Sequence, residues 1–130
     1  MSTVVSATFH RAPGRAEDFL SRAHGLLQQA HNHLRAGDVL LAVDYGYQAC
    51  LRAAGARGVD TRGRGKAWDK LQRIDAAGAA QAAQFRPWAP VRARAAAGLA
   101  ITKTPAEVAN FLGRVSYFIE EIEGGLPLVA

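Results

Sequence analysis

Hydrophobic residues recur at helical spacing through most of the chain. Between residues 15 and 36, apolar side chains fall on one side of a helix turning 100° per residue, which indicates an amphipathic helix. Residues 38–56 repeat this pattern, and Asp38 is a suitable N-cap for the second helix. Gly37, between them, suits the left-handed conformation that ends many helices. The short link predicts an antiparallel pair of helices.

The clearest helix lies near the C-terminus. Thr104 and Glu107 are spaced as in a capping box, and Pro105 stands at the first helical position. Seven apolar residues between 108 and 122 form a continuous stripe, and Gly124-Gly125 follows it. The pattern therefore predicts a long helix packed into the core.

The middle of the chain predicts shorter helices. One is expected over residues 66–77, burying Trp68 and Leu71, with Ile74 as a further candidate. An alanine-rich segment follows, but Pro87 and Pro90 each lack an N–H group and interrupt it. We therefore expect a break or kink over residues 86–90 and a short helix that continues to about residue 99.

These elements predict an all-α domain, an antiparallel bundle of four to five helices over residues 15–125. Residues 1–14 are expected to be a flexible arm, residues 56–65 a basic glycine-rich loop, and residues 126–130 a tail. The predicted core includes Phe19, Leu26, Leu40, Tyr47, Leu51, Trp68, Leu71, Phe111, Val115, Phe118 and Ile119.

Composition fits one folded domain. The chain has 130 residues, of which 49% are hydrophobic, and this is enough to bury a core. No apolar run approaches the ~20 residues that a membrane helix needs, and no secretory signal is recognisable at the N-terminus. The lone Cys50 has no partner for an internal disulfide and is interpreted as a small core residue. We expect a cytoplasmic protein without membrane contact.

The charge is distributed unevenly. The net charge is +5, and ten Lys/Arg stand against three Asp between residues 57 and 103. A basic segment of this kind attracts anionic partners, although solvated surface charge explains it equally well. The candidate phosphate-binding residues are Arg57, Arg62, Arg64, Lys66, Lys70 and Arg73, extended by Arg86, Arg92, Arg94 and Lys103. Glycines among them let backbone N–H groups close around phosphates. Trp88 either stacks on a base or packs against the bundle.

Motifs for catalysis and metal binding are missing. The histidines at positions 10, 24, 31 and 33 are not joined by a cysteine or carboxylate cluster, so we predict no metal site. Cys50 has no nearby base, and no hydrolase elbow, phosphate loop or dinucleotide fingerprint is present. The sequence therefore predicts no cofactor.

Four segments carry a family resemblance. They are residues 45–50 (YGYQAC), 65–71 (GKAWDKL), 92–98 (RARAAAG) and the helix over 104–123. In this order they resemble the HEPN superfamily, more narrowly a group of small HEPN proteins of actinobacteria, over residues 15–125. The resemblance implies a helical bundle, a tendency to form dimers, and contact with RNA, DNA or a nucleotide. The paired prolines depart from the smoother helix of the family.

The same resemblance argues against ribonuclease activity. HEPN ribonucleases carry Arg-x(4–6)-His near the start of the last long helix, but here no histidine follows His33 and no histidine has an arginine at that spacing. We therefore expect a non-catalytic binding or adaptor module that contacts nucleic-acid or nucleotide phosphates through the basic loop. One alternative is an antitoxin-like regulatory subunit that binds a protein partner or forms a homodimer. The other is a divergent metal-dependent nuclease using Asp44 or Asp69.

Overall fold

The computed structural model describes residues 11–62 and 66–125, and every regular element in these ranges is a helix. The helices are α2 (Arg11–Arg35), α3 (Val39–Ala56), α4 (Lys66–Gln72), α5 (Ala76–Phe85), α6 (Trp88–Ala96) and α7 (Pro105–Gly125). The predicted all-α bundle is confirmed. It has more helices than predicted, because the middle of the chain divides into three short ones.

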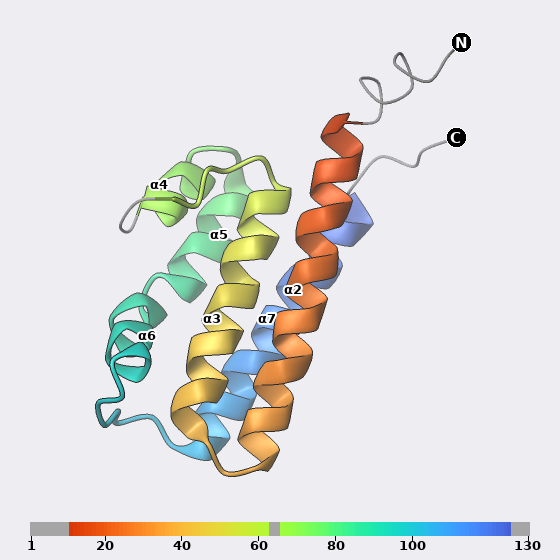
Figure 1. The fold of residues 1–130 in the computed structure, drawn as a ribbon. Helices are drawn as coiled ribbons and strands as arrows, with labels where there is room; N and C mark the ends of the chain where they lie inside the picture. The colour runs from red at the N-terminus through yellow and green to blue at the C-terminus, as the bar shows by residue number, and fades with distance from the viewer. Residues whose placement is uncertain (1–10, 63–65, 126–130) are drawn as a thin grey trace.

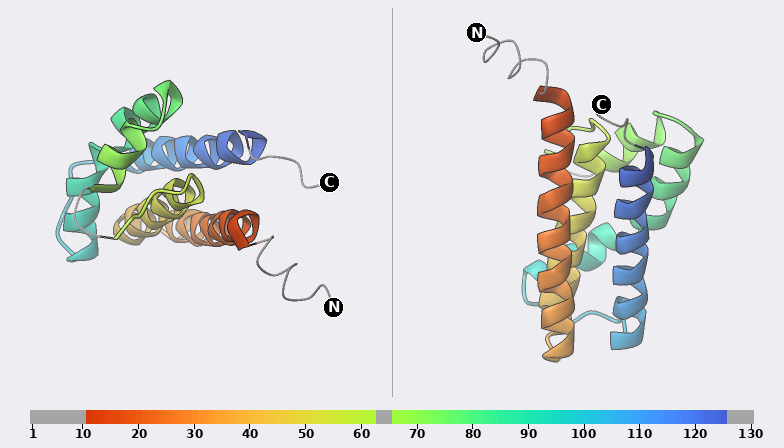
Figure 2. Two further views of the ribbon diagram at one scale, coloured as in Figure 1. Left: turned by 90° about the horizontal axis from the view of Figure 1, so that it is seen from above. Right: turned by 90° about the vertical axis from the view of Figure 1, so that its right-hand side faces the viewer.

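Three long helices form the body of the bundle (Figure 1). Helices α2 and α3 form the predicted antiparallel pair, and α7 packs against both of them. The short helices α4, α5 and α6 carry the chain from the end of α3 to the start of α7 (Figure 2). The start of α2, the end of α3 and the end of α7 therefore lie at the same end of the molecule.

The predicted helix signals operate as expected. Gly37 has a φ of 85°, and the Leu41 N–H group donates to the Asp38 carboxylate at 3.1 Å, which caps α3. The capping box is also present: Glu107 N–H donates to the Thr104 hydroxyl at 3.1 Å, and Thr104 N–H donates to the Glu107 carboxylate at 3.0 Å. Hydrogen bonding from the Thr104 backbone N–H group, and next from the Thr104 hydroxyl, lowers the pKa of the Glu107 carboxyl group.

The ends of the first and last segments differ from the predicted bounds. Helix α2 already includes Pro13 and Gly14, which the sequence pattern assigns to the arm. Proline is tolerated in the first turn of a helix because the N–H it lacks has no partner there. The rest of the predicted arm (residues 1–10), the tail (126–130) and the loop centre (63–65), with Arg64, lie outside the described residues.

The middle helices also differ from prediction. The segment expected as one helix over residues 66–77 is interrupted, because Asp75 caps a new helix by accepting from Gly78 N–H at 2.7 Å. Ile74 lies at this corner and is 45% exposed, so it is not a core residue. The predicted break near Pro87 is present, and α6 ends at Ala96, just before Gly98 with its φ of 74°.

The core runs the length of the bundle. Most of the predicted core residues are buried: Tyr47, Trp68, Leu71, Phe111, Val115, Phe118 and Ile119. Phe19, Leu26, Leu40 and Leu51 are partly buried and pack against them. Trp88 is only 7% exposed and stacks on Phe111 with ring centroids 4.1 Å apart, so it packs against the bundle and is not a surface stacking residue. Among the described helices, none has the length and apolarity needed to cross a bilayer.

Candidate anion-binding pocket

The loop after α3 begins with a tight, ordered turn. The N–H groups of Arg57 and Gly58 donate to the carbonyls of Ala54 and Gly55, at 3.0 and 2.9 Å. Gly58 has a φ of 86°, which a residue with a side chain rarely adopts. Val59 then enters the core with only 7% of its surface exposed. The turn and this anchor fix the direction in which residues 60–62 leave the bundle.

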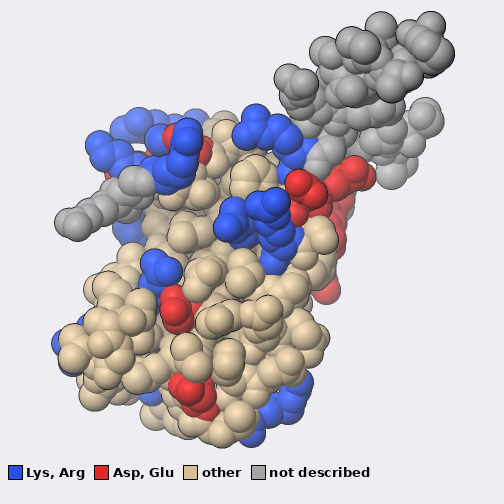
Figure 3. Space-filling model, in the orientation of Figure 1, with Lys and Arg blue, Asp and Glu red and all other residues tan. Residues whose placement is uncertain are grey.

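A pocket of about 540 Å³ lies where this loop passes the start of α2 and the end of α3. We call it the arginine pocket and define it by Arg15, Phe19, Arg52, Gly55, Asp60 and Arg62. In Figure 3, most of the visible Lys and Arg side chains gather at the end of the molecule where these elements meet. The pocket therefore lies at the end of the molecule where most of these basic side chains gather.

The apolar side of the pocket depends on a glycine. A Cβ atom at Gly55 would lie 3.0 Å from two carbons of the Phe19 ring, which is too close for most side chains. Gly55 thus lets the Phe19 ring pack directly against the backbone of α3. Phe19 remains partly exposed and lines the pocket, so it presents an aromatic surface beside the arginines.

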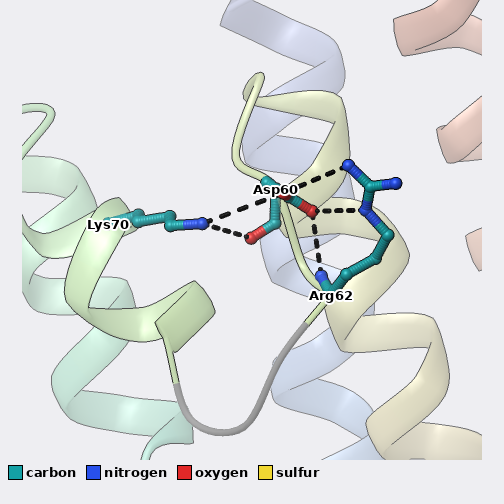
Figure 4. A network of polar contacts seen from close by, with 3 residues as sticks. All are labelled: Asp60, Arg62 and Lys70. Carbon is teal, nitrogen blue, oxygen red and sulfur yellow. Dashed lines mark hydrogen bonds and ion pairs between the residues drawn. The ribbon is translucent and has the colours of Figure 1, made fainter.

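The electrostatics of the pocket come from three arginines and one aspartate. Within the described residues, neither Arg15 nor Arg52 forms an ion pair with a carboxylate. Asp60 accepts from Arg62 through the backbone N–H and Nε, each at 3.0 Å, and through Nη2 at 3.3 Å (Figure 4). The pocket consequently has an excess of positive charge.

Lys70 ties the loop to α4. Its ammonium donates to the Asp60 carbonyl at 3.3 Å and lies 4.0 Å from the Asp60 carboxylate. The hydrogen bonds from Arg62 are the main reason that the pKa of Asp60 falls to about 2. This carboxyl group is therefore ionised at neutral pH, where it acts only as an acceptor.

Several predicted phosphate-binding residues bond to acceptors within the protein. Arg57 donates to Asp75 at 2.7 Å and to Gln81 at 3.4 Å, with only 19% of its side chain exposed. Arg92 donates to the Asp44 carboxylate at 2.9 Å, and Arg94 to a backbone carbonyl at 2.8 Å. These arginines hold helices and turns together.

Of the remaining predicted residues that the structure describes, Arg62 alone lines the arginine pocket. Lys66 is exposed at the start of α4, and Lys70 bonds to the loop as described. Arg73 is exposed just after α4, Arg86 donates to Asp69 at 2.6 Å, and Lys103 lies over the Trp88 ring. The predicted basic set is therefore spread over several elements.

Sequence reasoning missed Arg15 and Arg52. They are separated by 37 positions and belong to different helices, so a search for a continuous basic segment passes over both. The predicted antiparallel pair of helices could have indicated that these two arginines are neighbours. It places the start of the first helix beside the end of the second, and those are the positions of Arg15 and Arg52.

The two carboxylates considered for a nuclease, Asp44 and Asp69, each accept hydrogen bonds from side chains of the protein. Asp44 accepts from Arg92 and Gln48, and Asp69 accepts from Arg86. His24 lies 2.7 Å from Glu123 and links α2 to α7. In the described part of the chain, no three His, Cys, Asp or Glu side chains are grouped to hold a metal ion.

Cys50 lies in the core with no exposed surface. Burial raises the pKa of its thiol well above the ordinary value, because the thiolate would lose its hydration. The residue therefore packs as a small apolar side chain, and its thiol is not an activated nucleophile.

Comparison with known proteins adds no relative. No family model, no curated protein and no solved structure matches the chain. The resemblance to HEPN domains thus stays a prediction.

Proposed function

We propose that this protein is a non-catalytic, HEPN-like module that binds nucleic-acid or nucleotide phosphates in the arginine pocket. The observation that supports the proposal is that Arg15 of α2 and Arg52 of α3 line one pocket without an acidic partner among the described residues. Guanidinium groups form paired hydrogen bonds with phosphate oxygens, and they are charged at every physiological pH. Arg62 supplies a third guanidinium at the rim.

The fold supports this role by fixing both arginines on long helices. Side chains on rigid helices lose less freedom on binding than those on a loop, so less of the interaction energy is spent on ordering them. The basic loop then contributes Arg62 and closes one side. This assignment moves the centre of recognition from the loop, where the sequence placed it, to the paired ends of α2 and α3.

Arg52→Gln should weaken binding of single-stranded RNA by about tenfold, the size expected for losing one charge-assisted contact. Fluorescence anisotropy with labelled RNA at low and moderate salt measures the effect. The variant should also show a shallower dependence on salt, because fewer counterions are released on binding. Its thermal unfolding should be unchanged, because Arg52 holds no ion pair within the described residues.

Arg35→Gln is the matched control. Arg35 is exposed at the end of α2 and does not line the arginine pocket, yet its replacement removes the same charge. The control should bind RNA within a factor of two of the unmodified protein. Equal losses in the two variants would attribute binding to net charge alone, and RNA binding that both leave intact would contradict the proposed site.

A second candidate function, self-association, is favoured by the outer face of α7. Tyr117 is 62% exposed, the most exposed of the large hydrophobic side chains in the described residues. Arg114 and Glu121 lie three residues before and four after it, on the same side of the helix. If two copies pack these helices antiparallel about a twofold axis near Tyr117, each Arg114 faces the other copy's Glu121. The surface is thus complementary to itself.

Tyr117→Glu should convert such a dimer to a monomer at micromolar concentration, because it places two like charges beside the axis. Sedimentation velocity measures the change. Leu41→Glu is the control, since Leu41 is an exposed hydrophobic residue on α3. An unmodified protein that sediments as a monomer, or a dimer that both variants preserve, would exclude this interface.

A further inference from the structure

The arginine pocket combines three kinds of surface. Guanidinium groups come from Arg15 and Arg52, an aromatic ring from Phe19, and an ionised carboxylate from Asp60. Its volume of about 540 Å³ falls within the range of small-molecule sites and is more than a bare phosphate ion fills. A ligand that satisfies all three surfaces must carry an anionic group, a flat apolar face and hydrogen-bond donors.

The Asp60 carboxylate repels a phosphate group, so its presence in the pocket favours a ligand that also carries hydrogen-bond donors. Asp60 already holds Arg62 through three hydrogen bonds. Two of these end on Oδ1 and only one on Oδ2, and the Lys70 ammonium is 4.0 Å from Oδ2. Since each carboxylate oxygen has about two acceptor positions, Oδ2 retains capacity for a donor from a ligand.

Phe19 supplies the flat surface. Its ring packs against Gly55 and still lines the pocket, so a planar group entering between α2 and the loop meets an aromatic side chain. Nucleic-acid bases stack on such rings with little dependence on sequence. The aromatic surface and the arginines belong to the same pocket, so one ligand can reach both.

We infer that the pocket accepts a single ribonucleotide, with its phosphate between Arg15 and Arg52, its base against Phe19, and a ribose hydroxyl donating to Asp60. This inference rests on the proposed phosphate-binding function and specifies its ligand class. A ribonucleotide carries the anion, the planar base and the vicinal hydroxyl donors in one small molecule. Carboxylates elsewhere recognise ribose by accepting from its hydroxyls. A ribonucleotide at the end of an RNA strand can enter in the same way.

The test is isothermal titration calorimetry of the full chain with four probes: adenosine 5′-monophosphate, guanosine 5′-monophosphate, 2′,3′-dideoxyadenosine 5′-monophosphate and inorganic phosphate. We expect adenosine 5′-monophosphate to bind about tenfold more tightly than its dideoxy analogue, a factor typical of one hydrogen bond to a charged acceptor. Inorganic phosphate should bind more weakly than either nucleotide. Equal affinity for the ribo and dideoxy forms, or tighter binding of inorganic phosphate, would overturn the inference.

Asp60→Asn separates recognition of ribose from simple repulsion. If the carboxylate accepts from the ribose, the variant should lose the preference for adenosine 5′-monophosphate over the dideoxy form. If it only repels anions, every probe should bind the variant more tightly and the preference should persist, which contradicts the inference. Should the variant fail to fold, the ratio of ribo to dideoxy affinity in the unmodified protein still supports or overturns ribose recognition.

The outcomes also distinguish ribonucleotide binding from the proposed phosphate-binding function on which it rests. Labelled RNA that binds in an Arg52-dependent manner but is not displaced by adenosine or guanosine 5′-monophosphate would preserve the phosphate-binding function and reject the ribonucleotide. Absence of binding by RNA and by every nucleotide at low salt would reject both.

Discussion

Replacing Trp68 with alanine should lower the free energy of unfolding by about 3–5 kcal/mol, the usual cost of removing a large buried aromatic side chain. Trp68 is 1% exposed, and its indole N–H donates to the Tyr47 hydroxyl at 2.7 Å. Its ring also packs against Tyr47 and Phe85, with centroids 6.0 and 5.8 Å away. Alanine would remove these contacts and leave a cavity next to α3.

The effect should extend to the arginine pocket because α4 depends on this residue. Helix α4 has only seven residues, too few to be stable without packing. Trp68 and Leu71 are its large buried side chains, and Lys70 of the same helix holds the Asp60 carbonyl. Chemical denaturation followed by circular dichroism measures the loss of stability, and amide hydrogen exchange should show faster opening of residues 66–72.

Two further variants isolate the buried hydrogen bond. Tyr47→Phe leaves the indole N–H of Trp68 without its partner, and we expect a cost of about 1–3 kcal/mol. Trp68→Phe removes the donor instead, and the double variant should cost less than the sum of the two single changes. A Trp68→Ala protein that unfolds within about 1 kcal/mol of the original would show that α4 is not anchored in this way.

Signals confined to a few neighbouring residues were predicted correctly from the sequence. Asp38 and Thr104 cap their helices by bonding to N–H groups three residues ahead, and Gly37 ends α2 through its own backbone conformation. Each depends on chemistry that adjacent positions determine. The apolar stripe of the last helix is equally local, and it predicts the buried face of α7 because spacing alone decides which side chains share a face.

The middle of the chain was harder to predict because two local signals compete there. Trp68, Leu71 and Ile74 continue an apolar spacing that favours one helix, whereas Asp75 favours a new start. The capping bond from Gly78 N–H prevails, and it leaves Ile74 exposed at the corner. The spacing of apolar residues predicts which side chains share a helix face, but it does not predict whether an N-cap such as Asp75 starts a new helix.

The candidate site required contacts between distant positions. Arg57 pairs with a carboxylate 18 residues later, and Arg92 pairs with one 48 residues earlier. The positions of the basic residues in the sequence do not show that these two arginines bond to acceptors within the protein. Arg15 and Arg52 become neighbours of one pocket only through the antiparallel packing of α2 and α3. Charge composition alone therefore predicts a basic surface, and the packing of the helices determines which arginines line one pocket.

Gly78→Ala should destabilise the protein by about 3 kcal/mol, at the upper end of the usual cost of overpacking. A Cβ atom at Gly78 would lie 2.2 Å from the carbonyl oxygen of Leu71 and 3.1 Å from the Asp75 carboxylate. Backbone atoms of α4 cannot move aside as a flexible side chain does, so the corner between α4 and α5 must open. Thermal or chemical denaturation measures the change.

Gly25→Ala is the matched control, because Gly25 lies inside α2 and, beyond its chain neighbours and the helix's own backbone, no described atom lies within 4 Å of the added methyl group. Alanine is the better helix former, so this change should stabilise the protein by about 0.5–1 kcal/mol. A stabilising effect from both substitutions would show that the corner is not closely packed.

Opening the corner between α4 and α5 should also loosen Asp75, which caps α5 and holds Arg57 at the first turn of the loop. Because Arg57 begins the loop that carries Arg62, a looser Arg57 should also displace Arg62 from the arginine pocket. Gly78→Ala should therefore weaken RNA binding as well.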